Sequence, residues 1–125
     1  MAKLTKTART EFLTTAFTIT AAVAAELDER AESPDPIESA RAMALLIDAR
    51  NRRDDMAASL AFLKRRPAPG LKAISDEEAR HLDELAAILQ ERTKKGNMAN
   101  KSIAVLTEIM RTSDGISQIL DERSA

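Results

Sequence analysis

The pattern of hydrophobic and polar positions predicts four helical segments, and the first of them is apolar on more than one side. Residues 12–25 form a run of fourteen residues without charge, in which threonine hydroxyls are the polar side-chain groups. As a helix that ends in the charged run 26–30, this segment places apolar side chains on two faces. One face carries Phe12, Ala16, Ile19 and Val23, and the other carries Leu13, Phe17, Ala21 and Ala24.

A helix that is apolar all round is expected to be surrounded by other structure. Its threonines can be buried there, because a threonine hydroxyl can bond back to the carbonyl one turn earlier. The pattern therefore predicts that this helix is either the centre of a core or an intersubunit interface, and both interpretations stay open. The candidate residues for a protein interface are Phe12, Leu13, Phe17 and Ile19.

A second helix is predicted to begin after the break at residues 33–36. Asp35 can cap it and Pro36 suits its first turn. Its predicted apolar stripe is Ile37, Ala40, Ala44 and Ile47, widened by Met43, Leu45 and Leu46, and resumed by Met56, Leu60 and Leu63. The intervening run 48–55 is highly charged, and one helix over 36–66 would be about 46 Å long. The sequence therefore favours a kink or break near residues 51–55.

Two further helices follow the proline- and glycine-containing segment 67–70. Ser75 and Glu78 form a capping box for the third helix, which Gly96 is expected to stop. Asn97 or Asn100 is the expected cap of the fourth helix, and Gly115 is a candidate kink. The predicted buried stripes are Leu82, Leu85, Ala86 and Leu89 in the third helix, and Ile103, Leu106, Met110, Ile116 and Leu120 in the fourth. The sequence thus predicts one all-α domain over residues 1–125, a compact bundle of four main helical segments.

Composition narrows the chemistry that this bundle can perform. The chain contains 23 alanines and three phenylalanines but no tryptophan, tyrosine or cysteine, which excludes disulfides, thiolate metal sites and cysteine nucleophiles. Nineteen basic and 20 acidic side chains give no strong overall field. The uncharged run is shorter than the roughly 20 residues needed to span a bilayer. We expect a cytoplasmic protein that uses no membrane, cofactor or small-molecule substrate.

No motif of useful specificity points to catalysis or metal binding. Glu78 and the single histidine, His81, have the Glu-x-x-His spacing of carboxylate-bridged metal bundles, but such a site needs a second motif of this kind. A histidine at the boundary of the core, beside Leu85 and Ile88, is the alternative. Nucleophile-elbow and phosphate-loop sequences are also absent. We therefore expect a protein that is not an enzyme, with no catalytic, cofactor-binding or metal-binding residues.

Local basic clusters suggest a different partner. Basic side chains can bind a phosphate backbone through their positive charge alone. The alternative is that the same arginines form ion pairs along the helix with residues four positions away, Asp48 with Arg52 and Arg50 with Asp54. The candidate phosphate contacts are Arg50, Arg52, Arg53, Lys64, Arg65 and Arg66.

The sequence predicts a non-enzymatic helical interaction or assembly subunit, whose partner is another protein or further copies of itself. The alternative is a small helical subunit of a ribonucleoprotein or RNA-guided effector complex that binds the nucleic-acid backbone. That alternative rests on an analogy of size, helicity and charge, and no residues carry it.

Overall fold

The computed structural model describes residues 6–65, 76–94 and 98–122, in which every regular element is a helix. The four α-helices are α1 (Lys6–Arg30), α2 (Pro36–Arg65), α3 (Asp76–Lys94) and α4 (Ile103–Glu122), and a short 3-10 helix, η2 (Met98–Asn100), precedes α4. The predicted all-α helical bundle is confirmed. No described helix is long and apolar enough to cross a membrane.

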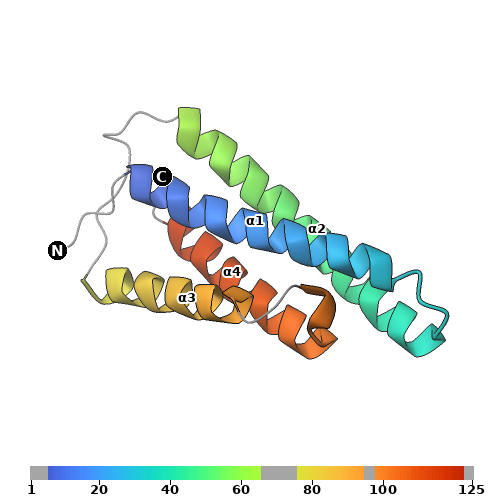
Figure 1. Cartoon of the computed structure of the whole chain (residues 1–125). Helices are drawn as coiled ribbons and strands as arrows, with labels where there is room; N and C mark the ends of the chain where they lie inside the picture. The colour runs from blue at the N-terminus through green and yellow to red at the C-terminus, as the bar shows by residue number, and fades with distance from the viewer. Residues whose placement is uncertain (1–5, 66–75, 95–97, 123–125) are drawn as a thin grey trace.

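Helix α1 is the centre of the arrangement, because it packs against both α2 and α4 (Figure 1). Helices α2 and α4 also contact each other, whereas α3 packs mainly on α4. The described part of the chain is therefore a three-helix core of α1, α2 and α4, with α3 on the outer side of α4.

The α1–α2 connection is held by the Asp35 cap that the sequence indicated and by a Ser39 hydrogen bond that it did not. The Asp35 carboxylate accepts a hydrogen bond from the Ile37 amide at 3.0 Å, and the Ser39 hydroxyl donates to the Ala31 carbonyl at 2.6 Å. Proline at position 36 opens α2, where its missing N–H costs nothing. The predicted cap of the second helix is confirmed.

The predicted break in the second helix is wrong, because α2 runs without interruption for 30 residues. At 1.5 Å per residue it is about 45 Å long. Residues 51–55 contain neither glycine nor proline, and their charged side chains reach solvent or ion-pair partners without disturbing the backbone. Charge alone therefore did not end the helix.

The start of α4 also differs from the prediction. Ser102 caps it, since the Ser102 hydroxyl accepts a hydrogen bond from the Val105 amide at 3.2 Å. Asn100 belongs to η2, and Asn97, Ser75 and Gly96 lie outside the described residues. Gly115 does not interrupt α4, and a Cβ atom built there would lie 3.6 Å from Leu85 Cδ1, which is ordinary van der Waals contact with α3.

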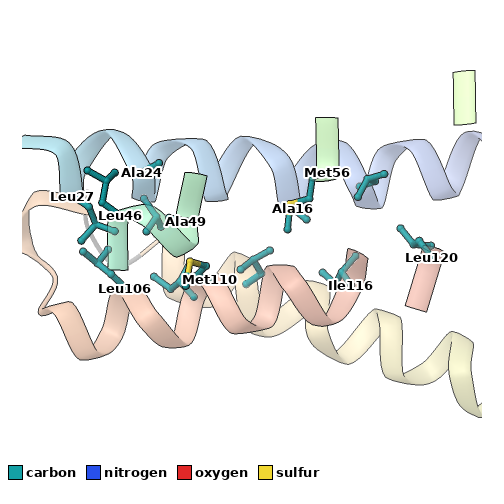
Figure 2. Close-up of a cluster of buried hydrophobic side chains, with 14 of the residues drawn as sticks. Ala16, Ala24, Leu27, Leu46, Ala49, Met56, Leu106, Met110, Ile116 and Leu120 are labelled. Carbon is teal, nitrogen blue, oxygen red and sulfur yellow. The ribbon is translucent and has the colours of Figure 1, made fainter. Parts of the chain in front are cut away.

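The core is a seam of small and medium-sized apolar side chains (Figure 2). Leu27 of α1, Leu46 of α2 and Leu106 of α4 lie together at one end, while Ala16 and Met56 meet further along. Its buried apolar members are Leu13, Ala16, Val23, Ala24, Leu27, Ala42, Leu46, Ala49, Met56, Leu82, Leu89, Leu106, Ile109, Met110, Ile116 and Leu120. The predicted stripes of the third and fourth helices are confirmed, as their members are buried or half-buried.

Within the described chain α1 is not covered on all sides, and the alternative that another subunit covers its remaining side stays a prediction. Its buried residues Leu13, Ala16, Thr20, Val23 and Leu27 are spaced alternately three and four apart, which makes a single stripe. Between Glu11 and Glu29, which are exposed on the same side, the opposite side of α1 carries the exposed residues Thr14, Thr15, Thr18, Ala22 and Ala25. Although residues 12–25 are uncharged, this part of α1 has one ordinary buried stripe, and its other side is exposed and neutral.

Thr20 also departs from the expected pattern for buried threonines. The back-bond to a carbonyl four residues earlier is made by Thr107 to Ile103 at 2.8 Å and by Thr93 to Leu89 at 2.9 Å. By contrast, the Thr20 hydroxyl oxygen is buried and has no hydrogen-bond partner among the described residues.

The predicted stripe of the second helix is right in part: Leu46 and Met56, which widened and resumed it, are buried, but its central positions face outward. Ile37, Met43 and Ile47 are 65%, 53% and 62% exposed, and Ala40 and Ala44 are exposed as well. Helix α2 instead buries Ala42, Leu46, Ala49 and Met56. Both stripes have helical spacing, so periodicity could not choose between them.

Two neighbouring residues test this register. Replacing Leu46, which is 6% exposed, with alanine should lower the free energy of unfolding by about 2–5 kcal/mol, since it leaves a cavity. The Ile47→Ala change removes a similar volume from an exposed position and should cost well under about 1 kcal/mol. Urea unfolding followed by circular dichroism measures both, and equal losses would contradict the observed register.

A second pair of variants tests the buried hydroxyl. Replacing Thr20 with valine removes an unpaired buried polar group while keeping the side-chain shape, and should stabilise the protein by about 1 kcal/mol. The matched control is Thr107→Val, which removes a hydrogen bond that is formed and should not stabilise. A destabilised Thr20→Val protein would show that the hydroxyl is satisfied in solution.

Candidate protein-interaction surface

The most distinctive surface of the molecule is an apolar stripe on the outside of α2. We call it the α2 outer face, and its residues are Ile37, Ala40, Met43, Ala44 and Ile47. It spans three turns of one helix, so these side chains form one continuous strip. Single exposed apolar residues are common on proteins, but a contiguous strip of them usually marks a contact surface.

One edge of the α2 outer face borders α1. The Arg50 guanidinium lies 3.1 Å from the Asp28 carboxylate of α1, which shows that this side of α2 faces α1. Met43 lies two turns before Arg50 on the same side of the helix. The part of α1 beside this edge is its C-terminal end, because Leu27 lies with Leu46 whereas Ala16 lies further along with Met56 (Figure 2). The exposed residues Thr14, Thr15, Thr18, Ala22 and Ala25, which we call the α1 neutral face, continue along α1 from there toward its N-terminus.

The other edge borders α4 and carries charges of both signs. Asp48 lies 3.8 Å from Arg52, whose guanidinium also reaches Asp114 of α4 at 3.5 Å. These residues line a cavity of about 220 Å³ together with Met110 and Arg111. Arg41 lies two turns before Asp48 on the same side of α2 and is exposed.

Each predicted phosphate contact whose side chain is described lies close to a carboxylate. Arg50 lies 3.1 Å from Asp28, Arg52 lies 3.5 Å from Asp114, and Arg53 lies 3.3 Å from Asp54. The expected Asp48–Arg52 pair is present, whereas Arg50 pairs with α1 instead of Asp54. Nothing is described of the side chains of Lys64 and Arg65, and Arg66 lies outside the described residues.

The predicted interface residues lie in or against the core of the chain. Leu13 is fully buried and is therefore unavailable to a partner in this fold. Phe12, Phe17 and Ile19 are half-buried and pack against the core cluster. Their role in an interface stays a prediction. The most exposed apolar residues, Ile37, Met43 and Ile47, lie instead on α2, where the sequence had placed the core stripe.

The histidine candidate is on the surface of α3. His81 is exposed and lines a cavity of about 330 Å³ with Glu77, Arg80 and Glu84. In the described part of the chain, no group of three or more histidine, aspartate or glutamate side chains could hold a metal ion.

A smaller apolar surface lies between α3 and α4. Arg92, Ala104, Val105 and Glu108 line a cavity of about 370 Å³, and Arg92 lies 3.8 Å from Glu108 across it. Ile88, one turn before Arg92 on α3, is 41% exposed. Since this exposed residue stands alone on its helix, it provides a control position for tests of the α2 outer face.

The seam between α2 and α4 contains a carboxyl group with an altered affinity for protons. Burial raises the pKa of Asp121 above its ordinary value of 3.8, and the charges of Asp55 and Asp114 raise it further. A hydrogen bond from Ser59 opposes this shift, because it favours the ionised carboxylate. The ionised form of Asp121 therefore opposes the packing of α4 on α2.

Comparison with protein-family models, curated protein sequences and solved structures finds no match to this chain. Its function is therefore argued from its own residues.

The Asp121 carboxyl gives a pH-dependent prediction. Because its pKa is raised in the folded state, its protonation adds stability that is present below about pH 3.8 and is lost as the pH rises through the raised value. An Asp121→Asn variant should therefore be more stable than the parent chain at neutral pH and equally stable below pH 3.8. Urea unfolding at the two pH values measures this, and a variant that is less stable at neutral pH would contradict it.

Proposed function

We propose that this chain is a non-enzymatic helical interaction subunit that works through protein–protein contacts made by the α2 outer face. One observation supports the proposal above others: Ile37, Met43 and Ile47 are each more than half exposed, whereas every other large apolar side chain of the described residues is at most 44% exposed. Removing these three side chains from water would favour association by roughly 25 cal/mol for each Å² covered.

The α1 neutral face supports the same proposal. Thr14, Thr15, Thr18, Ala22 and Ala25 carry no charge, so a partner seated on α2 can also cover this part of α1 without desolvating an ion. The Arg50–Asp28 pair lies between the two faces and is already neutralised within the chain. An interface with an apolar centre and paired charges at its rim is typical of protein–protein contacts.

Binding to a nucleic-acid backbone has less support. Phosphate binding by Arg50, Arg52 and Arg53 would have to compete with a carboxylate that lies within 4.0 Å of each guanidinium. A cytoplasmic location agrees with the absence of cysteine but stays a proposal.

Photo-crosslinking in native cells tests the proposed function. A benzophenone amino acid at Met43 should give a covalent protein adduct, while the same probe at Ile88 on α3 should give little, although both positions are exposed and apolar. No adduct at Met43, or equal yields at the two positions, would contradict the role of the α2 outer face. Adducts to nucleic acid instead of protein would favour the alternative function.

A further inference from the structure

The charges beside the α2 outer face are arranged so that the face complements itself. Arg41 and Asp48 lie seven residues apart on the edge that borders α4, and both are exposed. In an antiparallel pair of helices, this edge of one copy faces the same edge of the other, running in the opposite direction. Arg41 of each copy then lies opposite Asp48 of the other if the helices cross close to Ala44.

The side chains at that crossing point also suit close packing. Ala44 lies at the centre and Ala40 one turn away, so the two helix axes can approach closely. Met43 and Ile47 lie within three residues of the centre, where both copies contribute them to the same apolar contact. Their exposed fractions of 53% and 62% leave much of each side chain to be covered.

A parallel pair would not use these charges. In that orientation the edge with Arg41 and Asp48 faces the opposite edge of the other copy, which carries Met43 and Arg50. Arg50 is already held at 3.1 Å by Asp28, and Met43 has no charge. Asp48 also lies 3.8 Å from Arg52 of its own helix, but its side chain is 54% exposed and can contact a second cation. The charge pattern therefore favours the antiparallel orientation.

We infer that the partner of the α2 outer face is a second copy of this chain, bound as a two-fold antiparallel α2–α2 dimer with reciprocal Arg41–Asp48 pairs. The inference rests on the proposed function and names its partner. An interface of this kind is isologous, since the same surface patch serves both copies.

The area required explains why the α1 neutral face matters to this dimer. A stable interface covers about 800 Å² of each partner, which is roughly a ninth of the 7273 Å² of surface on this chain. The strip on α2 is three turns long and one side chain wide, so the dimer must also cover part of α1. Because α1 lies on the Met43 edge, the two α1 neutral faces come to lie on the same side of the α2–α2 pair.

The mass of the protein in solution tests the dimer. Light scattering with refractive-index detection suits a chain without tryptophan or tyrosine, and it should give twice the 13.7 kDa of one chain. An Ile47→Glu variant should give half the parent mass with an unchanged circular dichroism spectrum, while the control Ile88→Glu should remain a dimer. A parent chain that stays monomeric from micromolar to millimolar concentration would overturn the inference, as would dimers that persist in Ile47→Glu.

A charge exchange tests the orientation. Arg41→Asp and Asp48→Arg each place like charges across the antiparallel pair, so each variant alone should dissociate several-fold more readily than the parent chain. An equimolar mixture of the two variants should restore dimers, because every contact then joins opposite charges. Dimers that are equally stable in the single variants and the mixture would exclude the antiparallel arrangement.

These outcomes separate the inference from the proposed function. A monomeric parent chain whose probe at Met43 still captures a different protein in cells would remove the dimer and retain the interaction subunit. A probe at Met43 that captures nothing would remove the proposed function. An adduct of twice the chain mass, lost in Ile47→Glu, would support both.

Discussion

The packing of a single stripe of α1 against two helices at once is the constraint on which the rest of the structure depends. The stripe consists of Leu13, Ala16, Thr20, Val23 and Leu27, and both α2 and α4 pack on it. Because α2 and α4 share the stripe of α1, each of them contacts only part of it. Each of these two helices therefore buries only a narrow set of its own residues. In α2 this set includes Ala42, Leu46 and Ala49, and among the described residues the isoleucines on its far side, Ile37 and Ile47, stay largely exposed.

The small size of the seam residues makes this sharing workable. Alanine at positions 16, 24, 42 and 49 lets the backbones of α1 and α2 approach closely. The resulting dispersion contacts stabilise a core that contains few aromatic side chains. Polar links then fix the ends of the seam. Arg30, the last residue of α1, pairs with Glu26 of the same helix at 2.8 Å. Its guanidinium also donates hydrogen bonds to the Met98 and Ala99 carbonyls at 2.9 Å, which links η2 to α1.

Sequence patterns were sufficient for the class of fold but not for the direction in which α2 faces. The start of α2 followed from local chemistry, the Asp35 cap and Pro36, whereas the start of α4 and the length of α2 did not. The faces of α3 and α4 followed from polar residues opposite each apolar stripe. In α2, two apolar stripes with the same period compete: Ile37, Ala40, Ala44 and Ile47 against Ala42, Leu46, Ala49 and Met56. The second is buried and the first is exposed, although each contains two alanines and both have helical spacing. Tertiary packing makes this choice, and periodicity does not encode it. The candidate interaction surface was missed for the same reason, since its residues had been assigned to the core.

The apolar and charged parts of the candidate surface would have different roles in association. An exposed ion pair contributes about 0–1 kcal/mol, so Arg41 and Asp48 could not hold two copies together alone. Burial of Met43 and Ile47 supplies the favourable free energy, but an apolar strip accepts many partners and either orientation. Opposite charges on one edge reject the orientation that leaves them unpaired, so they give specificity to a contact whose strength comes from elsewhere. The α1 neutral face would have a third role. Its threonines and alanines add little to the strength of the contact, but they carry no charge that opposes the approach of a partner.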